Sequence, residues 1–210
     1  MNAPALKMRR FTYGDYRRWS AEERWELIDG EAWDMCPAPT RPHQQMVVEL
    51  TTQIHGFLRG KPCEVYSAPF DVRLPRADEA DDQVDTVVQP DIAVICDPAK
   101  LNDAGCRGAP DWIIEVLSKR TAVKDHTVKR DLYERRGVRE YWLVHPTDRV
   151  LTIYRLLDGA YGKPDVQGLT GETPVRVIEG LSIQWGDEPD AAAGPDEPAA
   201  DGAERGSPRP

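Results

Sequence analysis

The chain has 210 residues, of which 40% are hydrophobic and 30% are charged. This length is enough to bury one sizeable core but leaves little room for a second, so a single domain is expected. The sequence has no apolar run of about eighteen residues, and its basic, aromatic start lacks the apolar segment of a secretory signal; we therefore expect no membrane span and a cytoplasmic location.

The formal net charge of −9 argues against a nucleic-acid partner, because proteins bind phosphates through Lys and Arg. Its distribution weakens that argument. Residues 186–210 contribute a net charge of −5, which leaves −4 for residues 1–185, and residues 119–139 hold eight basic and three acidic side chains. This basic run is typical either of a phosphate-binding surface or of a solvated helix face.

The end of the chain differs in composition from the rest. Residues 186–210 are mostly Ala, Pro, Gly, Asp and Glu, which predicts a disordered acidic tail after a folded domain at residues 1–185. The four cysteines, Cys36, Cys63, Cys96 and Cys106, form no CxxC pair and have no His at a metal-ligand spacing. We therefore expect buried, reduced thiols.

In the N-terminal half, residues 13–23 can form a short helix, and the Asp29-Gly30 pair predicts a β-hairpin over residues 24–35. The apolar residues between Pro42 and Leu58 recur at helical spacing, with Pro42 suited to the first turn. Residues 65–74 alternate as a half-buried strand does.

In the C-terminal half, residues 87–96 and 112–117 are nearly continuous apolar runs, which are typical of central strands covered on both faces. Residues 121–136 form an amphipathic helix that ends at Gly137, and residues 140–144 and 150–156 read as two further strands. The order predicts a mixed α/β (α+β) fold with a central mixed sheet flanked by helices and an N-terminal hairpin.

Two of the predicted central strands contain one acid each in apolar surroundings. Asp91 precedes the apolar residues 92–95, and Glu115 interrupts the run 112–117. A buried carboxylate without a partner costs several kcal/mol, so something must compensate the charge. A cation such as Mg²⁺, which prefers carboxylates and water, would do so; an Arg partner for Glu115 and a loop position for Asp91 are the alternative.

The helix after Glu115 presents Asp125 and Lys129 four residues apart on one face. A lysine directed at the edge of the sheet could polarise a water molecule or stabilise charge on a phosphate. An ordinary i,i+4 salt bridge between Asp125 and Lys129 explains the same spacing.

Glu31 and His43 are further candidates. Glu31 shares its strand alternation with Trp33 and Met35, which predicts an inward carboxylate and a possible third acid. His43 falls at the centre of the apolar face of its helix, where it would either orient a ligand or water or serve as a satisfied core histidine.

Several short motifs resemble the Uma2 family of restriction endonucleases, also called DUF820, over roughly residues 10–185. They are residues 26–31, Pro42-His43, Pro90-Asp91, residues 114–118, Asp125 with Lys129 and Tyr133, and residues 137–144. The resemblance implies the restriction-endonuclease-like fold of the PD-(D/E)XK nuclease superfamily. It also implies Asp91 and Glu115 as ligands of Mg²⁺ or Mn²⁺, with the main-chain carbonyl of Val116 as a further ligand.

The chain departs from the superfamily pattern at one position. The lysine of a standard ExK motif would stand at position 117, where this sequence has Leu117. Lys129 is the first candidate to replace it, because a helix packed on the sheet can bring its amine to the same space. Lys119, beyond the expected end of the strand, is the second.

Two functions of different classes follow. The first is a metal-dependent endonuclease that hydrolyses phosphodiester bonds in nucleic acid, with DNA as the expected substrate and a homodimer as the expected assembly. The second is a nucleic-acid-binding or protein-interaction module that retains the nuclease fold without turnover, which the low positive charge and Leu117 favour.

Overall fold

Three β-sheets and a few helices make up the computed structural model, which describes residues 10–19, 24–35, 39–118 and 120–186. The larger sheet has the order β12 (Ala160–Tyr161), β11 (Val150–Leu157), β10 (Glu140–His145), β9 (Trp112–Val116), β6 (Ile92–Ile95) and β3 (Glu64–Ser67), with β13 (Asp165–Gly168) paired to β11. The six-stranded sheet, called the smaller sheet below, has the order β2 (Glu31–Asp34), β1 (Trp25–Ile28), β5 (Val87–Val88), β4 (Val72–Arg73), β8 (Gly105–Arg107) and β7 (Leu101–Asn102). The third contains β14 (Glu172–Pro174) and β15 (Ser182–Gln184). Parallel pairing of β9 with β10 among antiparallel neighbours confirms the predicted mixed α/β class.

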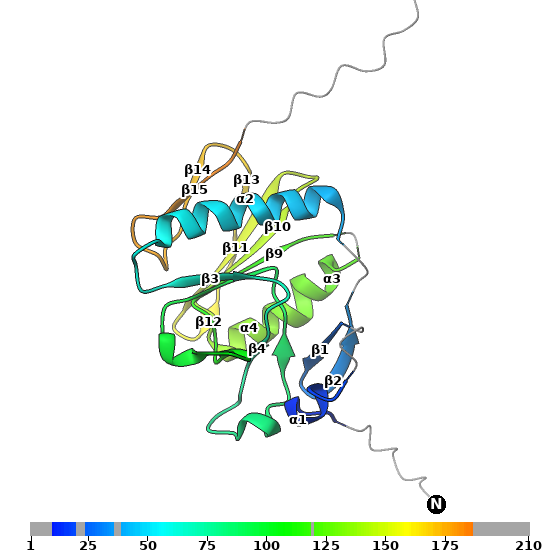
Figure 1. Ribbon diagram of the computed structural model, residues 1–210. Helices are drawn as coiled ribbons and strands as arrows, with labels where there is room; N and C mark the ends of the chain where they lie inside the picture. Colours follow the sequence, from blue (N-terminus) through cyan, green and yellow to red (C-terminus); the bar gives the residue numbers. More distant parts are fainter. Residues whose placement is uncertain (1–9, 20–23, 36–38, 119, 187–210) are drawn as a thin grey trace, which may run out of the picture.

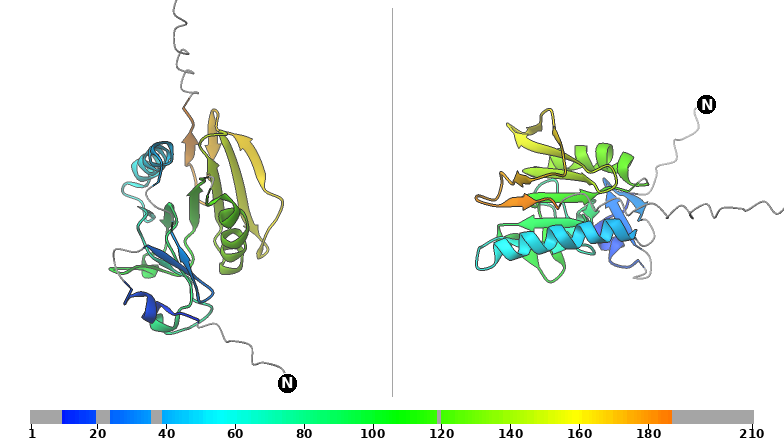
Figure 2. Two further views of the ribbon diagram at one scale, coloured as in Figure 1. Left: turned by 90° about the vertical axis from the view of Figure 1, so that its right-hand side faces the viewer. Right: turned by 90° about the horizontal axis from the view of Figure 1, so that it is seen from above.

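Helix α2 lies along one face of the larger sheet and α4 along the other (Figures 1 and 2). The described helical segments are α1 (Tyr13–Tyr16), α2 (Arg41–Leu58), η1 (Asp81–Gln83), η2 (Pro98–Lys100), α3 (Ala122–Lys124), η3 (Asp125–Lys129) and α4 (Arg130–Arg136). The predicted helix over 42–58 is confirmed as α2. Among the described residues, no helix is both long and apolar enough to cross a bilayer.

The helix predicted over residues 121–136 is confirmed in extent and contains one irregularity. It consists of α3, a π-helical turn η3 and α4, and it ends at Gly137, which has a left-handed φ of 84°. Such π-helical turns occur often at functional sites. Here the turn contains both Asp125 and Lys129, and both are buried.

Two predicted strands are wrong as single elements. Residues 65–74 form β3 in the larger sheet and β4 in the smaller one, and residues 87–96 form β5 and β6 in the same two sheets. Pro69 and Pro90 lie at the two breaks, where a residue without an N–H group cannot continue a ladder. The chain therefore crosses between the sheets at both prolines, and it does so again between β6 and β7 and between β8 and β9.

The N-terminal hairpin is confirmed, and its turn explains its register. Asp29 and Gly30 have φ values of 49° and 82°, as a two-residue turn with the twist of the strands requires. Glu26 pairs with Trp33 as a result, and Ile28 pairs with Glu31. The helix predicted over residues 13–23 is too long, because α1 ends at Tyr16; residues 20–23 lie outside the described residues.

The alternation of the central strands divides the interior into two clusters. One face of the larger sheet packs Trp112, Ile114 and Trp142 against α2 and the β14–β15 segment. The other packs Ile113, Leu117 and Tyr141 against α4 and the smaller sheet. Glu115 has the parity of Ile113 and Leu117, which directs it to the α4 side.

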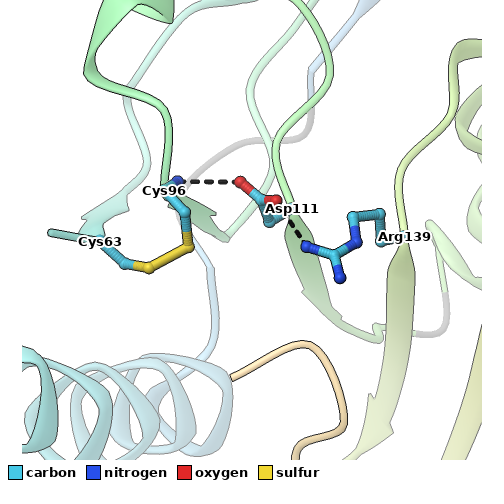
Figure 3. Close-up of a disulfide and its surroundings, with 4 residues drawn as sticks. All are labelled: Cys63, Cys96, Asp111 and Arg139. Carbon is cyan, nitrogen blue, oxygen red and sulfur yellow. Dashed lines mark hydrogen bonds and ion pairs between the residues drawn. A yellow bond between two sulfur atoms is a disulfide. The ribbon is translucent and has the colours of Figure 1, made fainter. Parts of the chain in front are cut away.

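Cys63 and Cys96 form a disulfide with an S–S distance of 2.07 Å (Figure 3). The antiparallel β3–β6 register brings the two cysteines together, because Glu64 pairs with Ile95 and the cysteines are the next residues beyond this pair. Next to the bridge, the Cys96 amide donates to Asp111, which also accepts from Arg139. The prediction of reduced thiols is wrong for this pair, because strand pairing brings together residues that are 33 positions apart; Cys106 is buried and reduced.

The last described strand carries core residues up to the expected domain boundary. Trp185 is 9% exposed, lies 6.4 Å from the ring of Trp142, and donates from Nε1 to the Thr173 hydroxyl at 2.8 Å. The disordered tail is predicted over residues 186–210, and all of it except Gly186 lies outside the described residues.

Trp185→Ala should lower the free energy of unfolding by about 3 kcal/mol, because it removes a large buried side chain from the core. Urea denaturation followed by circular dichroism measures this loss. Val166→Ala is the control, because Val166 is 64% exposed and its loss should cost less than about 0.5 kcal/mol. A Trp185→Ala protein as stable as the control would place the domain boundary before Trp185.

Candidate functional site

Asp91 and Glu115 come together at the point where the chain enters the larger sheet. Asp91 directly precedes β6, and its Oδ2 accepts a hydrogen bond from the Val116 amide at 2.8 Å. The Asp91 amide lies 3.4 Å from Oε2 of Glu115, on the neighbouring strand β9. The Glu115 carboxylate therefore lies beside the backbone of Asp91, and the Asp91 carboxylate lies beside the backbone of the residue that follows Glu115.

Lys129 reaches the same place from the helix. Its ammonium nitrogen lies 2.8 Å from Oε1 of Glu115, 2.9 Å from Oε1 of Glu26 and 3.9 Å from Oδ1 of Asp125. The Lys129 side chain is only 6% exposed. The expected i,i+4 contact with Asp125 is thus the longest of the three, and the shorter contacts cross between elements.

Two residues of this cluster were not among the sequence candidates. Glu26 on β1 is 1% exposed, accepts from the Gln89 amide at 3.0 Å and pairs with Lys124 at 2.6 Å. Tyr133 on α4 donates its hydroxyl hydrogen to Oε1 of Glu115 at 3.0 Å. The hairpin turn itself contained the signal for Glu26, because an Asp29-Gly30 turn pairs position 26 with Trp33 and so places both on one face.

The prediction that Glu31 directs its carboxylate inward is wrong. It shares a face with Glu26 and Trp33, as the alternation predicted, but it lies beside the turn and is exposed. Among the described residues, it makes no ion pair with the Lys129 cluster. Burial depends on the distance from the turn, which alternation does not contain.

His43 lies over the site from the first turn of α2. Its Nε2 is 3.2 Å from Oδ2 of Asp91, and its buried Nδ1 has no hydrogen-bond partner among the described residues. Burial lowers the pKa of His43, but the hydrogen bond to Asp91 and the backbone of Val116 outweigh burial and raise it. His43 is therefore positioned to orient Asp91 rather than to pack as an isolated core residue.

The structure shows what occupies position 117 and where one of the two candidate replacement lysines lies. Leu117 is 4% exposed and belongs to the apolar cluster beneath α4, so its side chain contributes packing. Lys129 reaches Glu115 from the helix. Lys119 lies outside the described residues.

The cluster carries more negative than positive charge. Burial raises the pKa of Glu115, and although Lys129 lowers it, the carboxylates of Asp125 and Asp91 raise it further, to about 8. Burial alone would raise the pKa of Glu26, but Lys129 and Lys124 lower it to about 2. Burial alone would lower the pKa of Lys129, but Glu115 and Glu26 raise it well above its usual range. Lys129 therefore stays charged; Glu26 has Lys124 as a second cation, whereas Glu115 pairs with Lys129 alone among the described residues.

The donor set fits a divalent cation of the Mg²⁺ type. Asp91, Glu115 and the main-chain carbonyl of Val116 would hold it, and its charge would offset the excess of carboxylates. No group of three or more acidic, His or Cys side chains converges as a metal cage among the described residues. Two carboxylates completed by water and substrate oxygens are the mode of binding that Mg²⁺ favours.

Most of the basic run at residues 119–139 is already paired. In the described part of this run, six of the basic side chains form ion pairs with acids: Lys124, Lys129, Arg130, Arg135, Arg136 and Arg139. The local positive charge therefore serves mainly to bind other segments of the chain, and the surface is less basic than its sequence indicates.

The low pKa of Glu26 predicts a stability that depends on pH. A carboxyl whose pKa falls from about 4.5 to about 2 on folding stabilises the fold above pH 4.5, and this contribution is lost as the pH falls toward 2. Glu26→Gln should therefore lose about 3 kcal/mol at pH 7 relative to the parent, and the difference should shrink below pH 4.5.

Urea denaturation of both proteins at pH 7 and pH 3 measures this difference. Glu31→Gln is the matched control on the same hairpin, and it should show no pH-dependent difference because Glu31 is exposed. Equal losses in the two variants at pH 7 would contradict the assignment of Glu26 to the buried cluster.

Comparison with known proteins concerns the family and the fold. The sequence matches the family model Uma2, described as "Putative restriction endonuclease", over residues 13–186. No curated protein gives a significant match. The fold resembles a crystal structure described as "a putative nuclease belonging to DUF820" from Anabaena variabilis, with a TM-score of 0.65 and 18% identity over 83% of this chain and 94% of that chain. At this identity the likeness concerns the fold, and it agrees with the predicted restriction-endonuclease-like architecture. Because the family match spans most of its length, the chain belongs to the Uma2 family.

Proposed function

We propose that this protein is a metal-dependent nuclease that hydrolyses phosphodiester bonds in DNA. The observation that carries the proposal is the convergence of Asp91, Glu115 and Lys129, with the lysine ammonium 2.8 Å from the Glu115 carboxylate. The family description supports the same chemistry. Phosphodiester hydrolysis needs charge stabilisation at the phosphate, and this cluster places two carboxylates and an ammonium group at one end of the central strands β6 and β9.

In the proposed mechanism, Asp91, Glu115 and the Val116 carbonyl hold Mg²⁺ or Mn²⁺. When bound, such a cation polarises a phosphate oxygen and lowers the pKa of a coordinated water. Lys129 fixes one oxygen of Glu115 and adds positive charge beside the phosphate. Since its pKa lies well above the usual range, Lys129 acts as a cation and not as the base that removes a proton.

His43 and Tyr133 are positioning residues in this scheme. His43 holds Asp91 from the α2 side of the sheet, and Tyr133 holds Glu115 from the α4 side. Hydrogen bonds of this kind fix the orientation of metal ligands and increase their affinity. A homodimer belongs to the same proposal, because two symmetric sites can cut the two strands of a duplex; light scattering of the purified protein tests it.

A second candidate function is supported by a specific observation. Lys129 is buried among three carboxylates, and much of the basic run on its helix is paired with acids. A chain with these pairings could retain the nuclease fold as a binding module without turnover. A panel of plasmid, linear, single-stranded and RNA substrates with Mg²⁺, Mn²⁺, Ca²⁺ or EDTA separates the two, since the module cleaves none of them.

Replacing the lysine tests the catalytic proposal. Lys129→Ala should lower the metal-dependent cleavage rate by about 100-fold or more, because one preorganised charge is lost. Lys129→Arg, which keeps the buried charge, should restore folding and part of the rate. Lys163→Ala is the control, because Lys163 is an exposed lysine away from the site.

Cleavage of a labelled duplex and calorimetric titration with Mn²⁺ are measured for each variant. Asp91→Ala should abolish Mn²⁺ binding, whereas Lys129→Arg should retain it. A folded Lys129→Ala protein that cleaves at the parent rate would remove Lys129 from the mechanism.

His43→Ala should weaken Mn²⁺ affinity by about 10-fold to 100-fold, because Asp91 loses the group that orients it. His55→Ala on the same helix is the matched control, because His55 is exposed. Calorimetry at constant pH gives both affinities. Equal affinities in the two variants would show that His43 only packs.

A further inference from the structure

A pocket of about 510 Å³ lies beside the proposed metal site. It forms where the chain crosses between the two sheets. The segment between β3 and β4 supplies Phe70 and Asp71, the segment between β5 and β6 supplies Gln89, and the β7–β8 turn supplies Asn102 and Gly105.

One wall of the pocket is a flat aromatic surface. The rings of Tyr66 and Phe70 are stacked with their centroids 4.2 Å apart and their planes within 5°. Both side chains are half-buried and line the pocket. A planar ligand can extend such a stack, and nucleic-acid-binding proteins hold bases on aromatic rings in this way.

Two polar side chains, Asp71 and Asn102, also line the pocket. Oδ1 of Asp71 accepts from the Tyr16 hydroxyl at 3.0 Å and from Nε2 of Gln89 at 2.9 Å, which fixes the carboxylate. Oδ1 of Asn102 accepts from Arg73 at 2.8 Å and from the Ala104 amide at 3.0 Å. Within the described residues, Oδ2 of Asp71 and the amide nitrogen of Asn102 make no hydrogen bond.

A free carboxylate oxygen and a free amide N–H group form an acceptor and a donor. On their Watson–Crick edges adenine and cytosine present the complementary pair, an exocyclic amino group next to an unprotonated ring nitrogen; guanine has an N1–H group beside its amino group there, and thymine and uracil lack the amino group. The pocket lining includes Asp71 and Asp103 and, among the described residues, no Lys or Arg. This charge disfavours a phosphate and leaves the neutral base as the part of a nucleotide that fits.

Residues in and next to the pocket lining are hydrogen-bonded to residues at the proposed metal site. The Ala68 amide donates to the Asp91 carbonyl at 3.1 Å, and the Gln89 amide donates to Glu26 at 3.0 Å. Gln89 precedes Asp91 by two residues, so their Cα atoms lie at most about 7 Å apart. A base in the pocket would belong to a nucleotide next to the phosphate at Asp91.

We propose that this pocket binds an unpaired adenine or cytosine of the substrate strand beside the scissile phosphate. The base extends the Tyr66–Phe70 stack on its outer face, Asp71 accepts from the exocyclic amino group, and Asn102 donates to the ring nitrogen. The inference rests on the proposed nuclease function and narrows its substrate to strands with an accessible base at the cleavage site.

Fluorescence anisotropy of labelled single-stranded dA, dC and dT 12-mers in Ca²⁺ tests the proposal with the full chain. The parent should bind the dA and dC strands more tightly than the dT strand. Phe70→Ala should weaken binding of the dA strand by roughly 5-fold to 150-fold through loss of stacking. Phe57→Ala, which removes a half-buried ring from α2, is the matched control and should leave binding unchanged.

Asp71→Asn is the second variant, and it is nearly isosteric, so folding is preserved. It replaces an acceptor by a group that also donates, and it should therefore lower the ratio of dA to dT affinity, an effect that a loss of stability does not produce. Thermal midpoints are measured for every variant.

The outcomes separate the pocket from the nuclease site. If the parent cleaves nucleic acid while Phe70→Ala and Asp71→Asn keep its affinities and base preference, the pocket proposal is refuted and the nuclease proposal stands. If the parent neither binds nor cleaves any nucleic acid, the nuclease proposal fails and the pocket proposal fails with it. Binding of spermidine that depends on Asp71, without any effect on the oligonucleotides, would reassign the pocket to a cationic amine.

Discussion

The structure depends on the burial of one ammonium group among three carboxylates. Lys129 of the helix contacts Glu26 of the hairpin, Glu115 of the central strand β9 and, at a longer distance, Asp125 of its own π-helical turn. Burying these charges is costly, and the cost is offset only while the partners stay together. The cluster therefore fixes the smaller sheet, the larger sheet and the helix relative to one another.

The surroundings of Glu115 differ from those of another buried acid, Glu140. Glu140, like Glu115, is a fully buried acid in a central strand, but its oxygens accept from the Trp142 indole and from the amides of Arg176 and Val177. Its Oε1 also lies 3.4 Å from Nε of Arg155, so Glu140 has three neutral donors and one cation of its own. Glu115 instead shares the Lys129 ammonium with Glu26 and Asp125, and burial, followed by the carboxylates of Asp125 and Asp91, raises its pKa to about 8.

The crossings between β3 and β4 and between β5 and β6 explain why the proposed metal site and the pocket are neighbours. Each crossing ends a strand of one sheet and begins a strand of the other, which frees backbone and side-chain groups from ladder pairing. Asp91 and Gln89 come from one crossing, and Phe70 and Asp71 come from the other. Chemistry and proposed base recognition thus share the part of the fold where neither sheet imposes regular pairing.

Local periodicity was enough to predict the hairpin with its Asp29-Gly30 turn, helix α2, the helix that ends at Gly137, and the apolar strand that carries Glu115. The ordered motifs also identified the family. Only the tertiary structure decided that Glu26 and not Glu31 reaches Lys129, that two apparent strands divide between two sheets, and that Cys63 meets Cys96. The physical reason is that periodicity fixes the face on which a side chain lies, whereas its burial and partners depend on contacts between segments far apart in the chain.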